Sequence, residues 1–199
     1  NWGAVRVVPR LSYAVDVTVS ATILHSDGER LNLRVVASDA RGQVWFDNVY
    51  ETLASKYAYD ASMPRDIDPY QATYNKIAND LLRFRTALTD DEILAVRTTA
   101  EMRFARDLAT DAFEDYVIET TSGAFQIRRL PAPDDPMLSR VRMIREREYL
   151  FIDTLDEYFS SFANEMFNPY QNWRRATYSE AIAYREERNK ARARLLAGT

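Results

Sequence analysis

The chain contains one histidine, His25, which is followed directly by Ser26 and Asp27. Serine, histidine and aspartate perform nucleophilic catalysis when distant segments hold their side chains in convergent positions, and neighbours in one turn do not meet that condition. His25 is therefore expected at a strand end beside a turn, and no catalytic triad is predicted. A single imidazole also excludes metal sites built on two histidines, including di-metal carboxylate bundles with paired Glu-x-x-His motifs.

Carboxylates are the remaining residues with catalytic potential. A glycosidase needs two acids that face each other across a cleft, roughly 5–10 Å apart, and a sequence alone does not exclude such a pair. Asp134 and Asp135 lie in a proline-rich loop, where turn formation is the expected role. The five glycines are scattered, which excludes a glycine-rich phosphate loop and a dinucleotide fingerprint. We predict no catalytic residue, no metal, no cofactor and no enzymatic activity.

Composition places the chain among ordinary globular proteins, because apolar residues make up 46% and charged residues 28% of it. Cysteine is absent, which excludes disulfides and Cys-ligated zinc and fits an oxidising compartment. No run of about 18 apolar residues is present, so we expect no transmembrane helix. The sequence opens at Asn1 without a starting Met, which fits a removed targeting segment or a longer parent chain.

Basic and aromatic residues gather near the C-terminus. The net charge is −4, yet residues 170–199 carry seven basic and three acidic side chains, which leaves −8 for the rest. Contact hot spots combine aromatic rings with guanidinium groups. We therefore predict a protein interface formed by Tyr170, Trp173, Arg174, Arg175 and Tyr178. Nucleic-acid stacking uses the same residue types, but the acidic total charge argues against it. The structural alternative is that Tyr170 and Trp173 pack this helix against the preceding one.

These side chains would be positioned by an α+β fold that begins with strands. Apolar residues occupy every second position from Val15 to Ile23, which predicts a half-buried strand. Turn residues at 26–29 lead into a second expected strand over 31–37, and turn residues at 39–42 lead into a third over 44–50. Two tight turns between three strands predict an antiparallel meander.

Helices follow the predicted meander. Asp68 and Pro69 predict a helix start, and residues 89–92 fit a capping box for a second helix. A small hairpin is expected around residues 121–123. Prolines make residues 131–136 an extended connector. Two long helices are expected over about 137–167 and 170–196, joined at Asn168-Pro169. They suggest a helical hairpin or an arm, and we predict the hairpin. The expected organisation is an α+β domain over 1–130, the connector, and a helical pair over 137–199.

Residues 4–88 contain a strand-and-turn pattern that is followed by a helix. The pattern consists of Val15–Ile23, a glycine turn, Leu31–Asp39 and then Arg41-Gly42-Gln43-Val44-Trp45, and the helix includes Tyr74–Leu81. This pattern resembles accessory domains of bacterial envelope lipoproteins. It is similar to the curli-secretion lipoprotein CsgG, the amino-terminal domain of TolB, the penicillin-binding-protein activator LpoB and the flagellar lipoprotein FlgO. The resemblance implies a periplasmic domain attached to the outer membrane.

We therefore expect a non-enzymatic scaffold or assembly module of the bacterial envelope, whose partners are other envelope proteins or further copies of itself. One alternative is a carboxylate-dependent hydrolase that acts on envelope polysaccharide. Another is a ligand-binding or nucleic-acid-binding domain that uses the basic C-terminal helix, for which binding would fall steeply with ionic strength.

Overall fold

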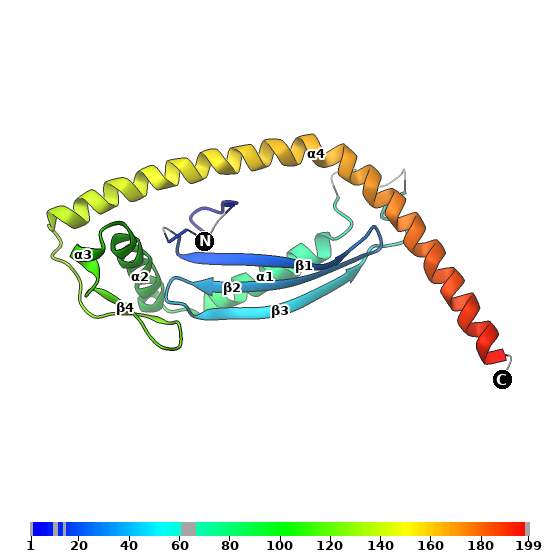
Figure 1. The fold of residues 1–199 in the computed structure, drawn as a ribbon, viewed down its shortest axis with the longest axis horizontal. Helices are drawn as coiled ribbons and strands as arrows, with labels where there is room; N and C mark the ends of the chain where they lie inside the picture. The colour runs from blue at the N-terminus through cyan, green and yellow to red at the C-terminus, as the bar shows by residue number, and fades with distance from the viewer. Residues whose placement is uncertain (1, 10–11, 14, 61–66, 198–199) are drawn as a thin grey trace. The chain divides into compact units, whose positions relative to one another are not determined.

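A computed structural model describes residues 2–9, 12–13, 15–60 and 67–197. The chain forms three strands, two long helices, a short helix, two short strands and a long C-terminal helix (Figure 1). The predicted α+β class is confirmed. Within the described ranges, no helix is both long enough and apolar enough to cross a lipid bilayer.

The three long strands form one sheet. They are β1 (Val17–Ser26), β2 (Arg30–Asp39) and β3 (Val44–Leu53), and they lie in the order β1-β2-β3. Each strand therefore pairs with its neighbour in sequence, and the predicted meander is confirmed. Four alternating residues of β2 are buried as expected: Leu31, Leu33, Val35 and Ala37.

Strand β1 differs from the prediction of a half-buried face. Val19, Ala21 and Ile23 are exposed, although their spacing is that of a strand with one apolar side. β1 is an edge strand, and alternation specifies which residues share a face without specifying what covers that face.

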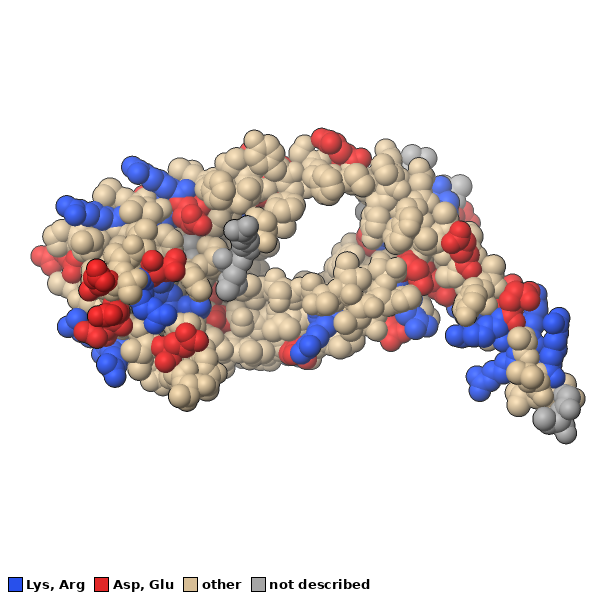
Figure 2. All heavy atoms as spheres, viewed as in Figure 1, with Lys and Arg blue, Asp and Glu red and all other residues tan. Residues whose placement is uncertain are grey.

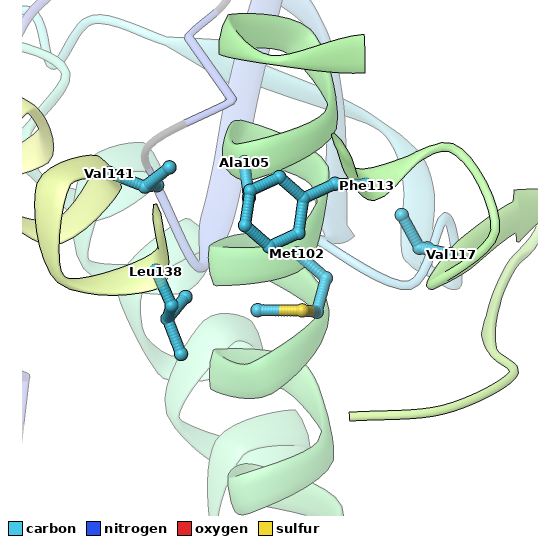
Figure 3. Packing of buried hydrophobic residues seen from close by; sticks show 6 residues of the cluster. All are labelled: Met102, Ala105, Phe113, Val117, Leu138 and Val141. Carbon is cyan, nitrogen blue, oxygen red and sulfur yellow. The ribbon is translucent and has the colours of Figure 1, made fainter. Parts of the chain in front are cut away.

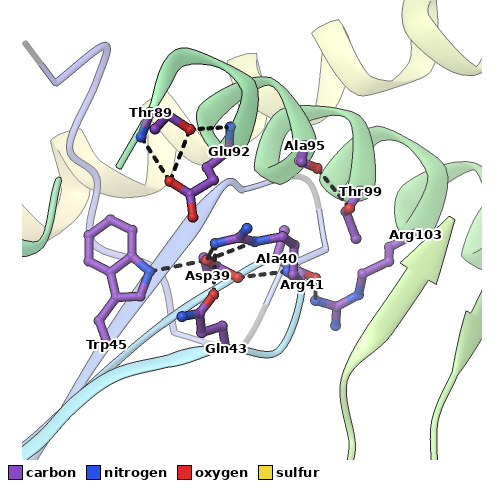
Figure 4. A network of polar contacts seen from close by, with 10 residues as sticks. All are labelled: Asp39, Ala40, Arg41, Gln43, Trp45, Thr89, Glu92, Ala95, Thr99 and Arg103. Carbon is purple, nitrogen blue, oxygen red and sulfur yellow. Dashed lines mark hydrogen bonds and ion pairs between the residues drawn. The ribbon is translucent and has the colours of Figure 1, made fainter. Parts of the chain in front are cut away.

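The turn between β2 and β3 is held by the buried carboxylate of Asp39 (Figure 4). This carboxylate accepts the backbone N–H of Arg41 at 2.9 Å, the Arg41 guanidinium at 2.7 Å and the indole N–H of Trp45 at 3.1 Å. Gly42 takes a positive φ of 78° in the same turn, a conformation that glycine adopts without a Cβ clash. Arg103 donates to the carbonyl of Ala40 at 2.7 Å. Polar contacts therefore fix the geometry of this turn.

The middle of the chain contains α1 (Gln71–Ala87), α2 (Asp90–Leu108), α3 (Thr110–Phe113), β4 (Val117–Glu119) and β5 (Phe125–Ile127). The predicted capping box at the start of α2 is present, since Thr89 accepts the N–H of Glu92 and the Glu92 carboxylate accepts the N–H of Thr89. The predicted small hairpin is also confirmed, with β4 and β5 antiparallel and Ile118 opposite Gln126.

The C-terminal residues form one helix, α4 (Pro136–Ala197), with Pro169 inside it. The predicted hairpin of two helices is therefore wrong. A proline in a helix interior removes one hydrogen bond and costs about 3 kcal/mol, yet the helix continues through residues 168 and 169. The helix begins where predicted, because Asp135 accepts the N–H groups of Met137 and Leu138 at 2.7 and 3.1 Å, so it serves as the N-cap.

The chain forms two compact units, and both draw on the sheet and on α4. The first unit comprises Asn1–Ser20, Val36–Asp47 and Leu81–Asn164, and the second comprises Ala21–Val35, Asn48–Asp80 and Glu165–Thr199. These units cut across the predicted division at residues 131–136. The first unit has an apolar core from α2, α3, β4 and the start of α4 (Figure 3), consisting of Met102, Ala105, Phe113, Val117, Leu138 and Val141.

Candidate interaction surface on the C-terminal helix

In the second unit, α4 packs directly against the turn between β1 and β2. A Cβ atom built on Gly28 would overlap the carbonyl oxygen of Arg174 and the backbone nitrogen of Tyr178. Only glycine permits so close an approach of two backbones. The glycine of this turn therefore matters for helix docking as well as for the turn itself.

Hydrogen bonds order the turn that receives the helix. The Asp27 carboxylate accepts the N–H groups of Glu29 and Arg30 at 2.7 and 2.6 Å, and its other oxygen lies 2.7 Å from Nε2 of His25. Burial opposes ionisation of Asp27, but the hydrogen bonds from Arg30, His25 and Glu29 outweigh it and lower its pKa. The hydroxyl of Tyr70 donates to the Asp27 carbonyl at 2.6 Å. Asp27 thus lies in the turn and His25 near the end of β1, as the sequence predicts.

Arg174 is the centre of the docking contact, with 1% of its surface exposed. Its two terminal nitrogens donate to the two carboxylate oxygens of Asp68 at 2.9 and 3.0 Å. Its guanidinium carbon lies 4.8 and 4.9 Å from the ring centroids of Tyr70 and Tyr170. A bidentate ion pair between two aromatic faces is a strong arrangement for arginine, because the planar guanidinium stacks and donates at the same time.

Charge and burial shift the pKa values of Asp68, Arg174 and Tyr70. Burial opposes ionisation of Asp68, but hydrogen bonds from Arg174 and from the Tyr70 N–H, together with the Arg174 charge, lower the pKa of Asp68. Burial likewise opposes the charged form of Arg174, and the hydrogen bonds and charge of Asp68 outweigh it, so the pKa of Arg174 is raised. Burial, with a smaller contribution from Tyr59, raises the pKa of Tyr70. The pair is therefore ionised and the tyrosine is neutral at neutral pH.

Two further contacts extend the docked segment. The ring of Tyr178 packs against that of Tyr59, with centroids 5.0 Å apart and planes tilted by 49°. Arg185 forms an ion pair with Glu29. The helix is therefore held against the second unit over residues 174–185.

The predicted interface residues separate into three groups. Arg174 is buried and Tyr178 is half-buried against Tyr59, so the prediction of an exposed contact role is wrong for Arg174. Tyr170 and Trp173 are 43% and 45% exposed, and their rings stack with centroids 5.7 Å apart. Arg175 is exposed, but two residues rotate a helix by about 200°, so it lies on another side from Trp173.

The structure brings Met166 into the same group as Tyr170 and Trp173. All three are exposed, and the spacing of four and then three residues places them on one side of α4. We call these three residues the aromatic patch. The sequence contains this spacing, but the nearby Asn168-Pro169 suggests a helix break that hides it.

The first unit contains a hollow of about 130 Å³ beside the β2–β3 turn, lined in part by Tyr13, Arg103 and Phe125. The guanidinium of Arg103 lies over both rings, 5.0 and 3.8 Å from their centroids. These contacts join the turn to the β4–β5 hairpin. Among the residues with described positions, no group of three or more His, Asp or Glu side chains is arranged to hold a metal ion.

Comparisons with protein families, with curated proteins and with solved structures found no match to this chain.

Proposed function

We propose that this chain is a non-enzymatic assembly module that binds another protein through the aromatic patch of α4, Met166, Tyr170 and Trp173. The observation that carries the proposal is that two stacked aromatic rings remain nearly half exposed beside a residue, Arg174, that fixes the helix. Rigid aromatic side chains provide large contact area at low entropic cost and are enriched in binding hot spots.

The charge of α4 indicates the kind of partner. Beyond residue 187 the helix has four basic side chains and no acidic one, Arg188, Lys190, Arg192 and Arg194, and Figure 2 shows blue spheres gathered at this end. Complementary potentials favour encounter with an acidic surface. We therefore propose an acidic protein as the partner. The envelope location that the resemblance implies belongs to the same proposal.

The test compares two tyrosine- or tryptophan-to-alanine changes on the same helix. Tagged full-length chain carrying Trp173→Ala is compared with Tyr184→Ala, whose tyrosine is exposed about three helical turns away. Proteins retained from an envelope fraction are quantified by mass spectrometry, with circular dichroism as the folding control. We expect at least one acidic protein to be retained by wild type and Tyr184→Ala and lost with Trp173→Ala.

Identical retention by both variants would contradict the patch assignment. A single-stranded oligonucleotide is titrated in parallel at several salt concentrations. Oligonucleotide binding that weakens steeply with salt and is reduced by Trp173→Ala would replace the protein partner with a nucleic acid.

A further inference from the structure

A second apolar surface lies on α4 within the first unit, N-terminal to the aromatic patch. Six residues at alternating spacings of four and three define it, and we call it the seam: Ile144, Glu148, Phe151, Leu155, Tyr158 and Phe162. Phe151, Tyr158 and Phe162 are 59%, 70% and 61% exposed. The middle of α4 shows mostly uncharged side chains in Figure 2. Spacing of this kind keeps residues along one side of a helix and is typical of helix pairing.

The seam borders the core of its own unit, since Glu148 and Leu155 are half-buried, while its other four residues are exposed. A different side of the same helix supplies that core, since Leu138, Val141 and Ile152 are buried. Phe151 and Ile152 are neighbours, and one residue turns the helix by about 100°. The packing that buries Ile152 therefore leaves Phe151 pointing elsewhere.

Charge along this stretch indicates what covers the seam. Residues 137–147 contain four arginines and one glutamate, a net charge of +3, and residues 148–164 contain four acidic and no basic side chains, a net charge of −4. Some of these charges are used within the unit, as in the ion pairs of Arg142 with Glu101 and of Arg6 with Asp153. The exposed charges that flank the seam keep the same polarity, with Arg140 and Arg147 at one end and Glu165, three residues beyond Phe162, at the other.

We propose that a second copy of this chain packs antiparallel along the seam, so that the protein is a two-fold symmetric dimer. A parallel copy would place like charges together, whereas an antiparallel copy places the basic end of each helix beside the acidic end of the other. A two-fold axis uses the same surface on both copies, as a self-complementary interface requires.

The residue order of the seam fits this arrangement. When Phe151 lies opposite Leu155 of the second copy, Ile144 lies opposite Phe162 and Glu148 lies opposite Tyr158 of the second copy. The one charged residue of the seam then faces a hydroxyl that can donate to it. A buried carboxylate without such a donor would be costly, so this register satisfies the one polar position among the apolar ones.

The oligomeric state of the full chain tests the proposal. Sedimentation velocity at tens of micromolar is expected to show a dimer for wild type and a monomer for Phe151→Glu. Leu150→Glu is the matched control, because Leu150 is an exposed apolar neighbour on the same helix that lies outside the seam. It is expected to remain dimeric, and circular dichroism checks that both variants keep their helix content.

Single cysteines test the orientation, since the natural chain has none. Arg147→Cys and Ser161→Cys lie on the same flank of the seam, and in the antiparallel register residue 147 of one copy lies close to residue 161 of the other. An oxidised mixture of the two variants is expected to form the heterodimeric disulfide. Ser161→Cys alone is expected to form little disulfide, because its two thiols would be about 24 Å apart along the helices.

A wild-type monomer under these conditions, or a dimer that Phe151→Glu leaves intact, would overturn the proposal. If Ser161→Cys forms a disulfide efficiently with itself and none with Arg147→Cys, the two helices pair in parallel and not antiparallel. Trp173→Ala is expected to leave the dimer unchanged, so loss of a partner at the aromatic patch and loss of self-association are separate outcomes.

Discussion

Replacement of Asp68 by asparagine gives the sharpest test of how α4 is held in the second unit. The change keeps the shape of the side chain and removes the charge that Arg174 requires. Arg174 would then be a guanidinium with 1% exposure facing a neutral amide. Removing one partner of a buried ion pair costs about 3–5 kcal/mol. Because 29% of the Asp68 side chain is exposed and water screens part of the interaction, we expect about 3 kcal/mol, the lower end of that range.

The same pair makes the second unit sensitive to acid. The pKa of Asp68 is lowered in the folded state, so the unfolded chain binds a proton at this position more readily. The stabilisation is complete above the unfolded pKa, about 3.9, and is lost as the pH falls through the lower, folded pKa. We expect Asp68→Asn to remove this part of the loss of stability at acid pH, while the parts contributed by other carboxylates remain.

Hydrogen exchange measured by mass spectrometry locates the effect. A loss of about 3 kcal/mol corresponds to a roughly 150-fold fall in protection, and we expect it in peptides from residues 170–185. Peptides from the first unit, over residues 96–118, should change little. Glu101→Gln is the control, because it breaks the exposed Arg142 ion pair, for which about 1 kcal/mol or less is expected. If Asp68→Asn lowers protection around residues 170–185 no more than Glu101→Gln lowers it around its own ion pair, the buried pair has no special role.

Two other substitutions test the packing of each unit. Gly28→Ala should lower the hydrogen-exchange protection of residues 174–178, because the added methyl overlaps the α4 backbone. Gly3→Ala should leave this protection unchanged, because a Cβ at Gly3 meets nothing within 4 Å. An unaltered exchange pattern in Gly28→Ala would contradict the close approach. Phe113→Ala should lower the free energy of unfolding in urea by about 3–5 kcal/mol, since Phe113 is fully buried in the first core, and a loss below 1 kcal/mol would show that this core is loosely packed.

Local signals in the sequence predict the elements well. The meander, the small hairpin and the capping box of Thr89 and Glu92 depend on residues close together in the chain. Turn geometry, alternation and helix capping are determined within a few residues, so the sequence displays them directly. The aromatic residues at 170 and 173 are also exposed as an interface would require, although their contact role remains a prediction.

Proline at 169 shows where a local signal misleads. Asn168-Pro169 predicts a break, yet α4 continues through it. On the C-terminal side of Pro169 the helix is held by buried Arg174, five residues later. The contact of Arg174 with Asp68 opposes the cost of the lost helical hydrogen bond, and it is visible only after the chain has folded.

The sequence by itself determined the α+β class, the three-stranded meander, the positions of most helix starts and the presence of a single histidine and no cysteine. Only the tertiary structure decided that Arg174 turns inward to Asp68, 106 positions away, and that the apolar face of β1 remains exposed. The physical reason is that backbone preferences and side-chain periodicity act over a few residues. Burial and charge pairing depend on which distant segments meet, and no short-range pattern encodes that choice.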